Sequence, residues 1–255
     1  MCEERKMSGL WQVPGWNEYE WLCHGFTTKE WGNLALHVGG DSEEVTAKRA
    51  QLADFLGFSL DQWVCGRQIH ETMIAQVGLA HRGSGAYTLE SALPGTDGLV
   101  TDAPGILLAC FFADCVPVFF LVPERKVVGI AHAGWRGTVG RIVEKMVETL
   151  VVLYQVDPGQ ILAAVGPSIG QCCYQVGRQV AEQFPQSTIE EREEGIYLNL
   201  KLANVLQLEA CGIDRSRIHC TEICTCCSEQ FYSYRRSGSQ AGRMAAVIGI
   251  NQMLP

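Results

Sequence analysis

Three short segments of the chain each place one metal-binding residue type beside glycine or an apolar stretch. They are GRQIH, which ends at His70, FADCVP around Cys115, and AHAGWRG, whose second residue is His132. Imidazole and thiolate are donors that zinc prefers, and three protein ligands leave a fourth coordination position open. An open position distinguishes a zinc ion that takes part in a reaction from one that only holds a fold. These segments therefore predict a catalytic zinc site.

The sequence around each ligand supports this prediction. His132 follows a β-branched stretch and enters a glycine-rich turn, where α/β proteins gather functional groups. Cys115 lies between two apolar segments, where a thiol is inert unless a metal or a cation lowers its pKa. Taken singly, these residues are better explained as core histidines and a buried thiol, but together with His70 they favour a site. Asp114, beside Cys115, has two interpretations: a hydrogen-bond partner of the site or a buried structural acceptor.

Hydrophobic periodicity indicates the elements that must position these ligands. Asp41 and Glu44 resemble a helix capping arrangement, and apolar residues then recur on one helical face up to Gly57. A second helix is predicted after Thr138, which is expected to cap it, with an apolar stripe that ends at Val151. Short apolar or β-branched segments predict strands of a mixed sheet at 72–79, 97–101, 106–112, 116–122, 126–131, 161–166 and 243–250.

The charge of the chain excludes some classes of partner. Lys and Arg number 20 against 28 Asp and Glu, and the resulting net charge of −8 repels phosphate backbones and anionic lipid headgroups. Nucleic acid and membrane surfaces are therefore not expected partners. A small anion such as phosphate is still compatible with this charge, because a few arginines can dominate the local field inside a cleft.

Nothing along the chain marks a boundary between domains. A chain of 255 residues with no low-complexity tract, charge block or repeat is expected to form one domain over residues 1–255. The N-terminal segment has no apolar core of signal-peptide length, so a cytoplasmic location is expected. The longest apolar run, 106–122, is interrupted by Asp114 and Pro117 and falls short of the roughly 20 residues of a membrane span. It predicts two buried strands.

The chain contains 12 cysteines. Without an export signal they are expected to be reduced, and most of them to be small core residues. The segment CTCC at 224–227 places three thiols in four residues and could bind a second metal. A single run of this kind lacks the paired C-x-x-C spacing of a structural zinc site, so packing is the favoured interpretation. Cys172 and Cys173 are also expected to be packing residues.

Six motifs in order along the chain resemble the laccase-domain, or YfiH-like, family. They are QIH at 68–70, TDGLVT at 96–101, ADCVP at 113–117, AHAGWRG at 131–137, GPSIGQCCYQVG at 166–177 and FYSYRRSGSQAGRMAA at 231–246. The resemblance implies an α+β fold, a single domain with mixed β-sheets flanked by helices. It also implies a zinc-dependent purine nucleoside phosphorylase that converts adenosine, inosine or guanosine and phosphate to free base and ribose 1-phosphate. An adenosine deaminase side activity accompanies that function in the family.

The same resemblance assigns individual residues. His70, Cys115 and His132 match the zinc ligands of the family, and Arg49 and Arg236 match two arginines near the substrate. Phosphorolysis builds positive charge on the ribose and negative charge on the departing base. The two arginines are therefore expected to hold phosphate through fork-shaped guanidinium contacts.

Two positions depart from the pattern of the family. Lys48 stands where the family usually has asparagine before the first arginine, and Ser237 stands where an acidic residue usually follows the YRR triplet. The first departure bears on the local phosphate geometry and the second on the orientation of Arg236. Arg67, Arg136 and Arg243 have two equal interpretations, site residues or structural ion-pair partners, and are left out of the core site. Trp135 could stack on a purine base or fill the turn, and packing is slightly favoured.

Three other classes of function compete with this one. A polyphenol oxidase or laccase needs many imidazoles in paired H-x-H runs, and six histidines without such a pair make copper less favoured than zinc. A hydrolase with Cys115 as nucleophile and His132 as base fits the residue types. A binding protein with a structural zinc would need a fourth ligand, and no nearby Cys or His provides a convincing one.

Overall fold

Two β-sheets packed face to face form the centre of the protein, for which the computed structural model describes residues 9–252. The five-stranded sheet has the order β1 (Leu10–Trp11), β2 (Leu22–Thr27), β14 (Met244–Ile250), β6 (Ile106–Phe112), β3 (Trp63–Cys65). The six-stranded sheet has the order β13 (Ile218–Cys220), β9 (Leu162–Val165), β7 (Val116–Val122), β8 (Val127–Ala133), β5 (Thr96–Thr101), β4 (Met73–Gln76).

Both sheets combine parallel and antiparallel pairs. In the first sheet β14 runs antiparallel to β2 and β6, whereas β3 runs parallel to β6. In the second sheet β7 is antiparallel to β8 and β9, whereas β4 is parallel to β5 and β13 to β9. The mixed sheets that the sequence predicts are therefore confirmed.

Alternating side chains of the central strands separate the layers. On β6, Leu108 and Phe112 join the cluster between the two sheets, while Leu107 and Ala109 face a cluster that includes Leu52. Leu52 belongs to helix α1 (Ser42–Phe55), which covers the outer face of the five-stranded sheet. Its predicted start is confirmed, because the side chain of the N-cap residue Asp41 accepts a hydrogen bond from the backbone of Glu43.

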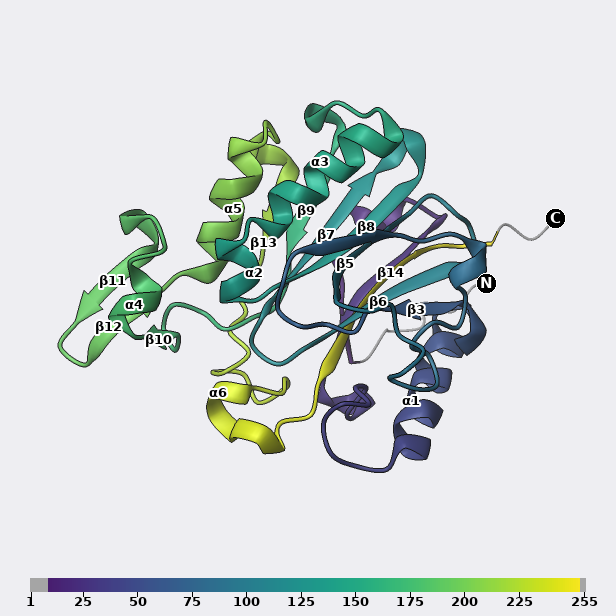
Figure 1. Ribbon diagram of the computed structural model, residues 1–255, viewed down its shortest axis with the longest axis horizontal. Helices are drawn as coiled ribbons and strands as arrows, with labels where there is room; N and C mark the ends of the chain where they lie inside the picture. The colour runs from purple at the N-terminus through teal and green to yellow at the C-terminus, as the bar shows by residue number, and fades with distance from the viewer. Residues whose placement is uncertain (1–8, 253–255) are drawn as a thin grey trace.

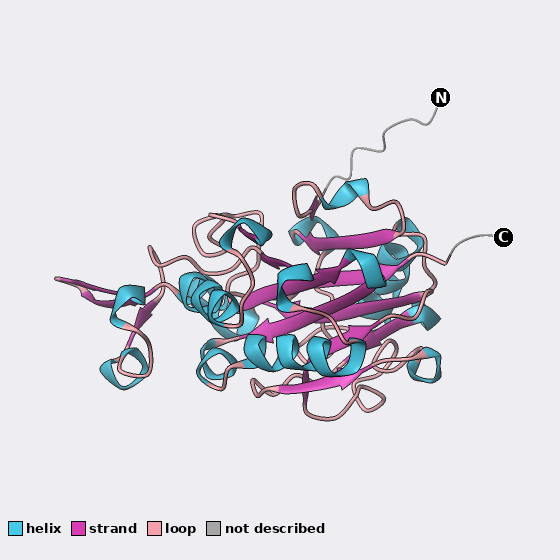
Figure 2. Ribbon diagram, turned by 90° about the horizontal axis from the view of Figure 1, so that it is seen from above, coloured by secondary structure: helices cyan, strands magenta, loops and turns pink. Residues whose placement is uncertain are grey.

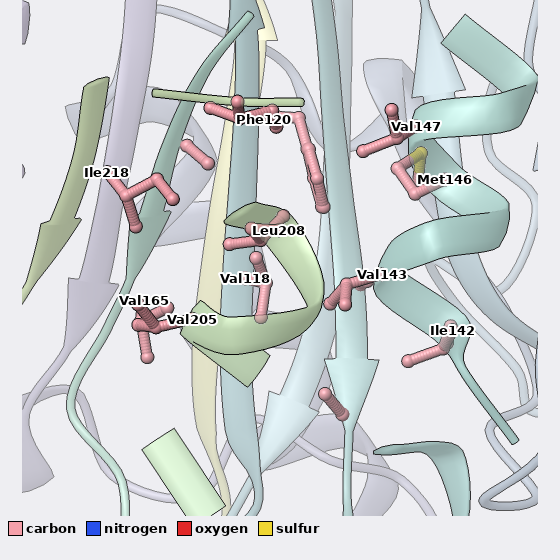
Figure 3. Packing of buried hydrophobic residues seen from close by; sticks show 14 of the residues in the cluster. Val118, Phe120, Ile142, Val143, Met146, Val147, Val165, Val205, Leu208 and Ile218 are labelled. Carbon is pink, nitrogen blue, oxygen red and sulfur yellow. The ribbon is translucent and has the colours of Figure 1, made fainter. Parts of the chain in front are cut away.

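Helices α3 (Ile142–Tyr154) and α5 (Leu200–Ala210) cover the outer face of the six-stranded sheet, on the side of the molecule opposite α1 (Figure 1). Figure 3 shows Val143 of α3 and Leu208 of α5 near Val118 of β7, and all three belong to one buried cluster. The architecture is thus helix, sheet, sheet, helix, which confirms the predicted α+β fold with mixed β-sheets flanked by helices.

The predicted cap of the second helix is wrong. Thr138 lies inside a short helix, α2 (Trp135–Val139), where its hydroxyl donates to the carbonyl of Gly134. Helix α3 begins only after Arg141, whose φ of 66° interrupts the helical path. Periodicity predicted the apolar stripe but not this break, because Arg141 is a residue type that rarely adopts the left-handed conformation.

A smaller element projects from the body of the molecule (Figures 1 and 2). It is the three-stranded sheet of β10 (Gln175–Val176), β12 (Gly195–Leu198) and β11 (Ile189–Arg192), with helix α4 (Arg178–Ala181) beside it. The last helix, α6 (Tyr234–Ser237), precedes β14. Within residues 9–252, none of the helices combines the length and the hydropathy required to cross a membrane.

Candidate metal centre and adjoining cavity

The structure brings the three predicted ligands together at one end of the space between the two sheets. His132 is on β8, Cys115 immediately precedes β7, and His70 lies in the connection between β3 and β4. One potential ligand atom of each lies within 4.8 Å of the other two. Gly134 makes this approach possible, because a Cβ atom there would lie 3.0 Å from Cys115 Sγ and 3.3 Å from His70 Cδ2.

A buried carboxylate holds two of these ligands. Asp97 on β5 accepts a hydrogen bond of 2.8 Å from Nδ1 of His132. The same carboxylate accepts the backbone N–H groups of Ile69, His70 and Glu71 at 3.0, 3.1 and 3.0 Å. His70 adopts a φ of 63°, an unusual value for a residue other than glycine, within this row of donors. Asp97 thus fixes both a ring and a strained loop.

This contact also determines how His132 faces the site. When Nδ1 binds a carboxylate, Nε2 is the nitrogen left for a metal, and such a carboxylate makes the imidazole a better ligand. The donor set of two imidazoles and one thiolate, with the carboxylate behind one imidazole, therefore fits a zinc ion with an open position.

The three groups alter the pKa values of one another. Burial would raise the pKa of the Cys115 thiol, but the nearby His132 and His70 rings outweigh it and lower the pKa to about 6. Burial would lower the pKa of His132, but Cys115 and Asp97 outweigh it and raise the pKa to about 9. Without metal, Cys115 and His132 therefore form a thiolate and imidazolium pair at neutral pH.

Asp114, the residue beside Cys115, anchors a distant segment. Its carboxylate accepts hydrogen bonds from the hydroxyl groups of Thr225 and Ser233 at 2.7 and 3.0 Å, and from the backbone N–H of Arg235 at 2.6 Å. Asp114 has a φ of 85°, so the two residues of the site with positive φ are His70 and Asp114. Of its two interpretations, the contacts favour a buried structural acceptor.

A cavity of about 430 Å³ opens next to the ligand cluster. This size is within the range of about 300–1,000 Å³ that is typical of small-molecule sites. Its walls contain the three ligands, several apolar and aromatic side chains and two arginines. The lining residues are His37, Gln68, His70, Phe111, Ala113, Asp114, Cys115, His132, Ile169, Tyr174, Leu200, Tyr234, Arg235 and Arg243.

The structure does not bring Arg49 to this cavity. Its side chain is 2% exposed, Nε donates to the carbonyl of Leu34 at 2.7 Å, and Nη1 donates to the carbonyls of Gly85 and Ala86 at 2.7 and 2.9 Å. The guanidinium group also lies 4.5 Å from the ring centre of Phe111. Nε and Nη1 of Arg49 are thus directed to the backbone, and its side chain lines a smaller neighbouring cavity of about 260 Å³ together with His37 and Gln68. These contacts do not support the expected phosphate-binding role in the cavity beside the ligand cluster.

Arg236 also lies outside the cavity lining. Its Nη1 donates to the carbonyls of Thr225, Cys226 and Ser228 at 3.0, 2.8 and 3.2 Å, and Nη2 donates to that of Phe231. The guanidinium group therefore organises the loop before α6 instead of facing a substrate. The expected contact of Arg236 with phosphate is therefore not supported by these contacts.

The cavity presents two other arginines. Arg235 and Arg243 both line it, and Arg243 is a residue whose role the sequence left open. Nη1 of Arg243 donates to the carbonyls of Ala241 and Gly242, and no residue within 9–252 accepts a hydrogen bond from its Nε or Nη2. These two nitrogens can therefore bind a ligand.

The interpretation of Trp135 as a packing residue agrees with its contacts. Its side chain packs against the core, and the guanidinium group of Arg136 lies 4.4 Å from its ring centre.

His37 and Gln68 are further residues that sequence reasoning missed. Burial, assisted by the charge of Arg243, lowers the pKa of His37 to about 4, so its ring is neutral at pH 7. Gln68 positions Phe111, because its side-chain amide accepts from the backbone N–H and donates to the carbonyl of that residue at 2.8 and 3.0 Å.

The signals for the missed residues were inside the quoted motifs. Asp97 is the second residue of TDGLVT, Gln68 the first of QIH, and Arg235 directly precedes Arg236 in the YRR triplet. Motif membership marked these segments but could not decide which side chain faces the cavity.

Comparison with known proteins shows which family shares this architecture. Residues 24–251 match a family model described as "Multi-copper polyphenol oxidoreductase laccase". The chain is 44% identical over 243 residues to "Purine nucleoside phosphorylase YlmD" of Geobacillus stearothermophilus, which covers 88% of this chain and 89% of that protein. It is 34% identical over 241 residues to "Adenosine deaminase RL5" of an unknown prokaryotic organism, over 91% of this chain and 88% of that protein.

Solved structures give the same result. The crystal structure of YlmD from Geobacillus stearothermophilus superposes with a TM-score of 0.92 at 40% identity, over 98% of both chains. That of the Bacillus licheniformis hypothetical protein YfiH superposes with a TM-score of 0.91 at 38% identity, over 95% of this chain and 97% of that chain. From its motifs, its fold and these matches, the chain belongs to the laccase-domain family that contains the YfiH and YlmD proteins.

Proposed function

We propose that the protein is a zinc-dependent purine nucleoside phosphorylase, with deamination of adenosine as a side activity. The observation that carries this proposal is the opening of the His70, Cys115 and His132 cluster into a cavity of about 430 Å³ that also presents Arg243. The names of the relatives support it, since one is a purine nucleoside phosphorylase and another an adenosine deaminase.

The three ligands would hold the metal at one wall of the cavity. Zinc bound there would supply a Lewis acid that polarises an oxygen of the substrate or of the nucleophile. Asp97 contributes by keeping the ring of His132 in one orientation, and its contacts with the backbone of residues 69–71 keep His70 in place.

Phosphate binding is assigned to Arg243 and Arg235. Nε and Nη2 of Arg243 point to no acceptor within residues 9–252, and a guanidinium edge binds two oxygens of a phosphate at once. Arg235 is partly committed, because Nη1 and Nη2 donate to the carbonyls of Cys173 and Gln175. It therefore contributes mainly positive charge, while Arg243 contributes direct hydrogen bonds.

The nucleoside would occupy the aromatic part of the cavity. Phe111, Tyr174 and Tyr234 offer flat surfaces on which a purine can stack. A phosphate oxygen then forms a bond to C1′ of the ribose while the bond from C1′ to the base nitrogen breaks, and the base leaves with the electron pair and takes up a proton. The neutral ring of His37 can hydrogen bond to the departing base, because it keeps one N–H donor.

For the side activity, the amino-bearing carbon of adenine would take the place of C1′ next to the metal. Water adds to this carbon and ammonia leaves, so adenosine becomes inosine. The two reactions require different placements of the same nucleoside in one cavity, which explains how one site would support both.

The experiment that tests the proposal follows adenosine and inosine with and without phosphate. Phosphorolysis predicts free base and ribose 1-phosphate in equal amounts only when phosphate is present, and loss of this reaction when a chelator has removed the metal. Release of base at the same rate without phosphate would identify a nucleoside hydrolase instead.

One observation favours a second candidate function, a cysteine hydrolase. Cys115, His132 and Asp97 form a sequence of nucleophile, base and orienting carboxylate, and the pKa of Cys115 is lowered to about 6. Such an enzyme would be inactivated by alkylation of Cys115 in its metal-free form and would keep its activity in the presence of a chelator. A phosphorylase that depends on metal would lose activity under both treatments.

A laccase-type oxidation is not proposed, in spite of the description of the matched family. Within residues 9–252, the cluster at the cavity contains only two imidazoles, and the other cluster with metal-binding side chains contains cysteines alone. Multicopper chemistry requires a larger set of imidazoles.

A further inference from the structure

We propose that Cys172, Cys173, Cys224 and Cys227 form a second metal site, which takes a thiophilic divalent ion, zinc in the first instance. The four sulfur atoms lie within 4.8 Å of one another. Cys227 Sγ is 3.5 Å from Cys172 Sγ and 3.3 Å from Cys173 Sγ. A tetrahedral zinc with sulfur at about 2.3 Å requires sulfur atoms about 3.8 Å apart, so small side-chain adjustments would complete the site.

Two loops from different parts of the chain are already joined at this cluster. Cys172 and Cys173 lie in the turn between β9 and β10, and Cys224 and Cys227 lie in a turn after β13. Their backbones pair directly, because the N–H of Thr225 donates to the carbonyl of Ser168 at 3.0 Å. The four thiols therefore lie close together because the backbones of the two loops are paired, and metal binding does not have to bring the loops together.

The surroundings of Cys224 suit a metal-bound thiolate. The backbone N–H of Gly170 donates to Cys224 Sγ at 3.1 Å, and such bonds stabilise a negatively charged sulfur. Gly170 also leaves room for the cluster, since a Cβ atom there would lie 3.1 Å from Cys172 Sγ and 3.4 Å from Cys224 Sγ. Gly170 thus provides both an N–H donor to Cys224 Sγ and the room that the sulfur atoms occupy.

Charge gives a second, independent argument. A divalent ion bound by four thiolates carries a net charge of about −2, which a nearby cation offsets. Lys201 is 6% exposed, and its Nζ donates to the carbonyls of Thr221 and Ile223 at 2.8 and 2.7 Å. No carboxylate within residues 9–252 forms an ion pair with Lys201, although a buried cation ordinarily requires an anion. Cys224 and Cys172 of the cluster lie near enough to act on the charge of Lys201, as do Cys220 and Glu222. The metal and its thiolates would add to the negative charge that this buried cation requires.

Two arginines of α6 contact these loops. Arg235 donates to the carbonyl of Cys173, and Arg236 donates to that of Cys226, again without an ion pair among the described residues. These contacts link the cysteine loops to α6. Because Tyr174 and Arg235 line the cavity, the second metal would hold one wall of the proposed active site in place. The proposal itself does not depend on the reaction at that site.

Metal analysis of the full chain tests this proposal. We expect two equivalents of metal in the wild-type protein purified without chelator, one in the double variant Cys224→Ser and Cys227→Ser, and one in Cys115→Ala. The matched control is Cys226→Ser in the same loop, which should keep both. Loss of metal in Cys226→Ser, or two equivalents in the double variant, would overturn the ligand set.

Cobalt spectra provide a measurement that does not require a cysteine-loop variant to fold. In Cys115→Ala loaded with Co²⁺, the four-cysteine site should give intense thiolate-to-cobalt absorption in the near ultraviolet and visible bands of tetrahedral cobalt. Absence of these bands would overturn the proposal. So would a wild-type mass 2 Da below that of the reduced chain, with alkylation showing a disulfide within the cluster.

Discussion

The carboxylate of Asp97 lies 2.8 Å from Nδ1 of His132, and both side chains are almost fully buried. This pair connects two strands of the six-stranded sheet, because Asp97 is on β5 and His132 on β8. Asp97 also binds the backbone around His70, so one carboxylate controls two of the three candidate metal ligands. The positions of His132 and His70 therefore depend on a side chain of the six-stranded sheet.

Replacing Asp97 should weaken metal binding. Asp97→Asn places N–H donors where one carboxylate oxygen accepts, so His132 and the loop at residues 69–71 lose part of their support. We expect metal affinity to fall by about 10–100-fold, as for other carboxylate partners of metal-bound histidines. Competition with a chromophoric chelator measures this change. Asp102→Asn, on an exposed carboxylate after the same strand, should leave the affinity unchanged, and equal affinities of both variants would contradict the assigned role.

Removing the thiol of the site should remove its metal. Cys115→Ala leaves two imidazoles, too few for a stable zinc site, so one equivalent of metal should be lost together with phosphorolysis. Elemental analysis and product analysis check this. Cys110→Ala is the control, because this buried thiol on β6 packs in the core and lies outside both clusters. Retention of all metal by Cys115→Ala would refute the ligand assignment.

Arg243 should matter for phosphate. Arg243→Met keeps much of the side-chain volume but removes the charge and the two nitrogens available to a ligand. Hydrogen bonds to charged groups contribute about 1.5–3 kcal/mol, so KM for phosphate should rise by about 10–100-fold, with a smaller change for the nucleoside. Initial rates at varied phosphate measure this. Arg141→Met, at an exposed arginine paired with Glu144, should behave as wild type. An unchanged KM for phosphate in Arg243→Met would show that Arg243 does not bind phosphate.

Arg49 should matter for stability instead. Arg49→Met leaves the buried carbonyls of Leu34 and Ala86 without their guanidinium donor, and leaves that of Gly85 with only the weak donor Cys65 Sγ. Unsatisfied buried acceptors each cost about 1–3 kcal/mol, so the free energy of unfolding should fall by about 3 kcal/mol or more. Urea denaturation measures this loss, and KM for phosphate should stay near the wild-type value below the transition. A large rise in that KM with unchanged stability would restore the role that the resemblance implies.

Acid should destabilise the fold through His24. Its Nε2 accepts a hydrogen bond of 3.0 Å from the backbone of Val13, and burial lowers its pKa from 6.5 to about 4. The unfolded chain therefore takes up a proton at a pH where the folded chain does not, so this contribution is complete above pH 6.5 and is lost as the pH falls toward 4. The loss reaches about 3 kcal/mol.

Denaturant unfolding of the wild type and of His24→Gln between pH 7 and about pH 4 tests this linkage. Glutamine provides an acceptor without titrating, so the variant should lose less stability over this range. His81→Gln, at a half-buried histidine in a surface turn, is the control and should retain the wild-type slope. Equal slopes in all three proteins would show that other groups cause the acid sensitivity.

Much of the fold was predictable from the sequence because the relevant signals are local. The predicted strands 106–112 and 116–122 coincide with β6 and β7, since both faces of these strands are buried and nearly every residue is apolar. The prediction of strand 72–79 was less accurate, and only residues 73–76 form β4, which lies at a sheet edge and is partly exposed. Strand β2 and helix α5 were not predicted, and both depend on packing against elements far away in the sequence.

The residue types that could bind a metal, and the motifs that contain them, were evident before folding was considered, since His70, Cys115 and His132 were all named from the motifs. The partner that each polar group faces depends instead on the packing of distant segments. Arg49 and Arg243 are the same residue type, yet one donates to carbonyls in the interior while the other lines the cavity. The four cysteines of the second cluster come from segments about 50 residues apart, so their grouping exists only after β9 and β13 have paired. The residue types of metal ligands and hydrogen-bond donors can thus be read from the sequence, whereas the groups that they contact are determined by the packing of segments far apart in the chain.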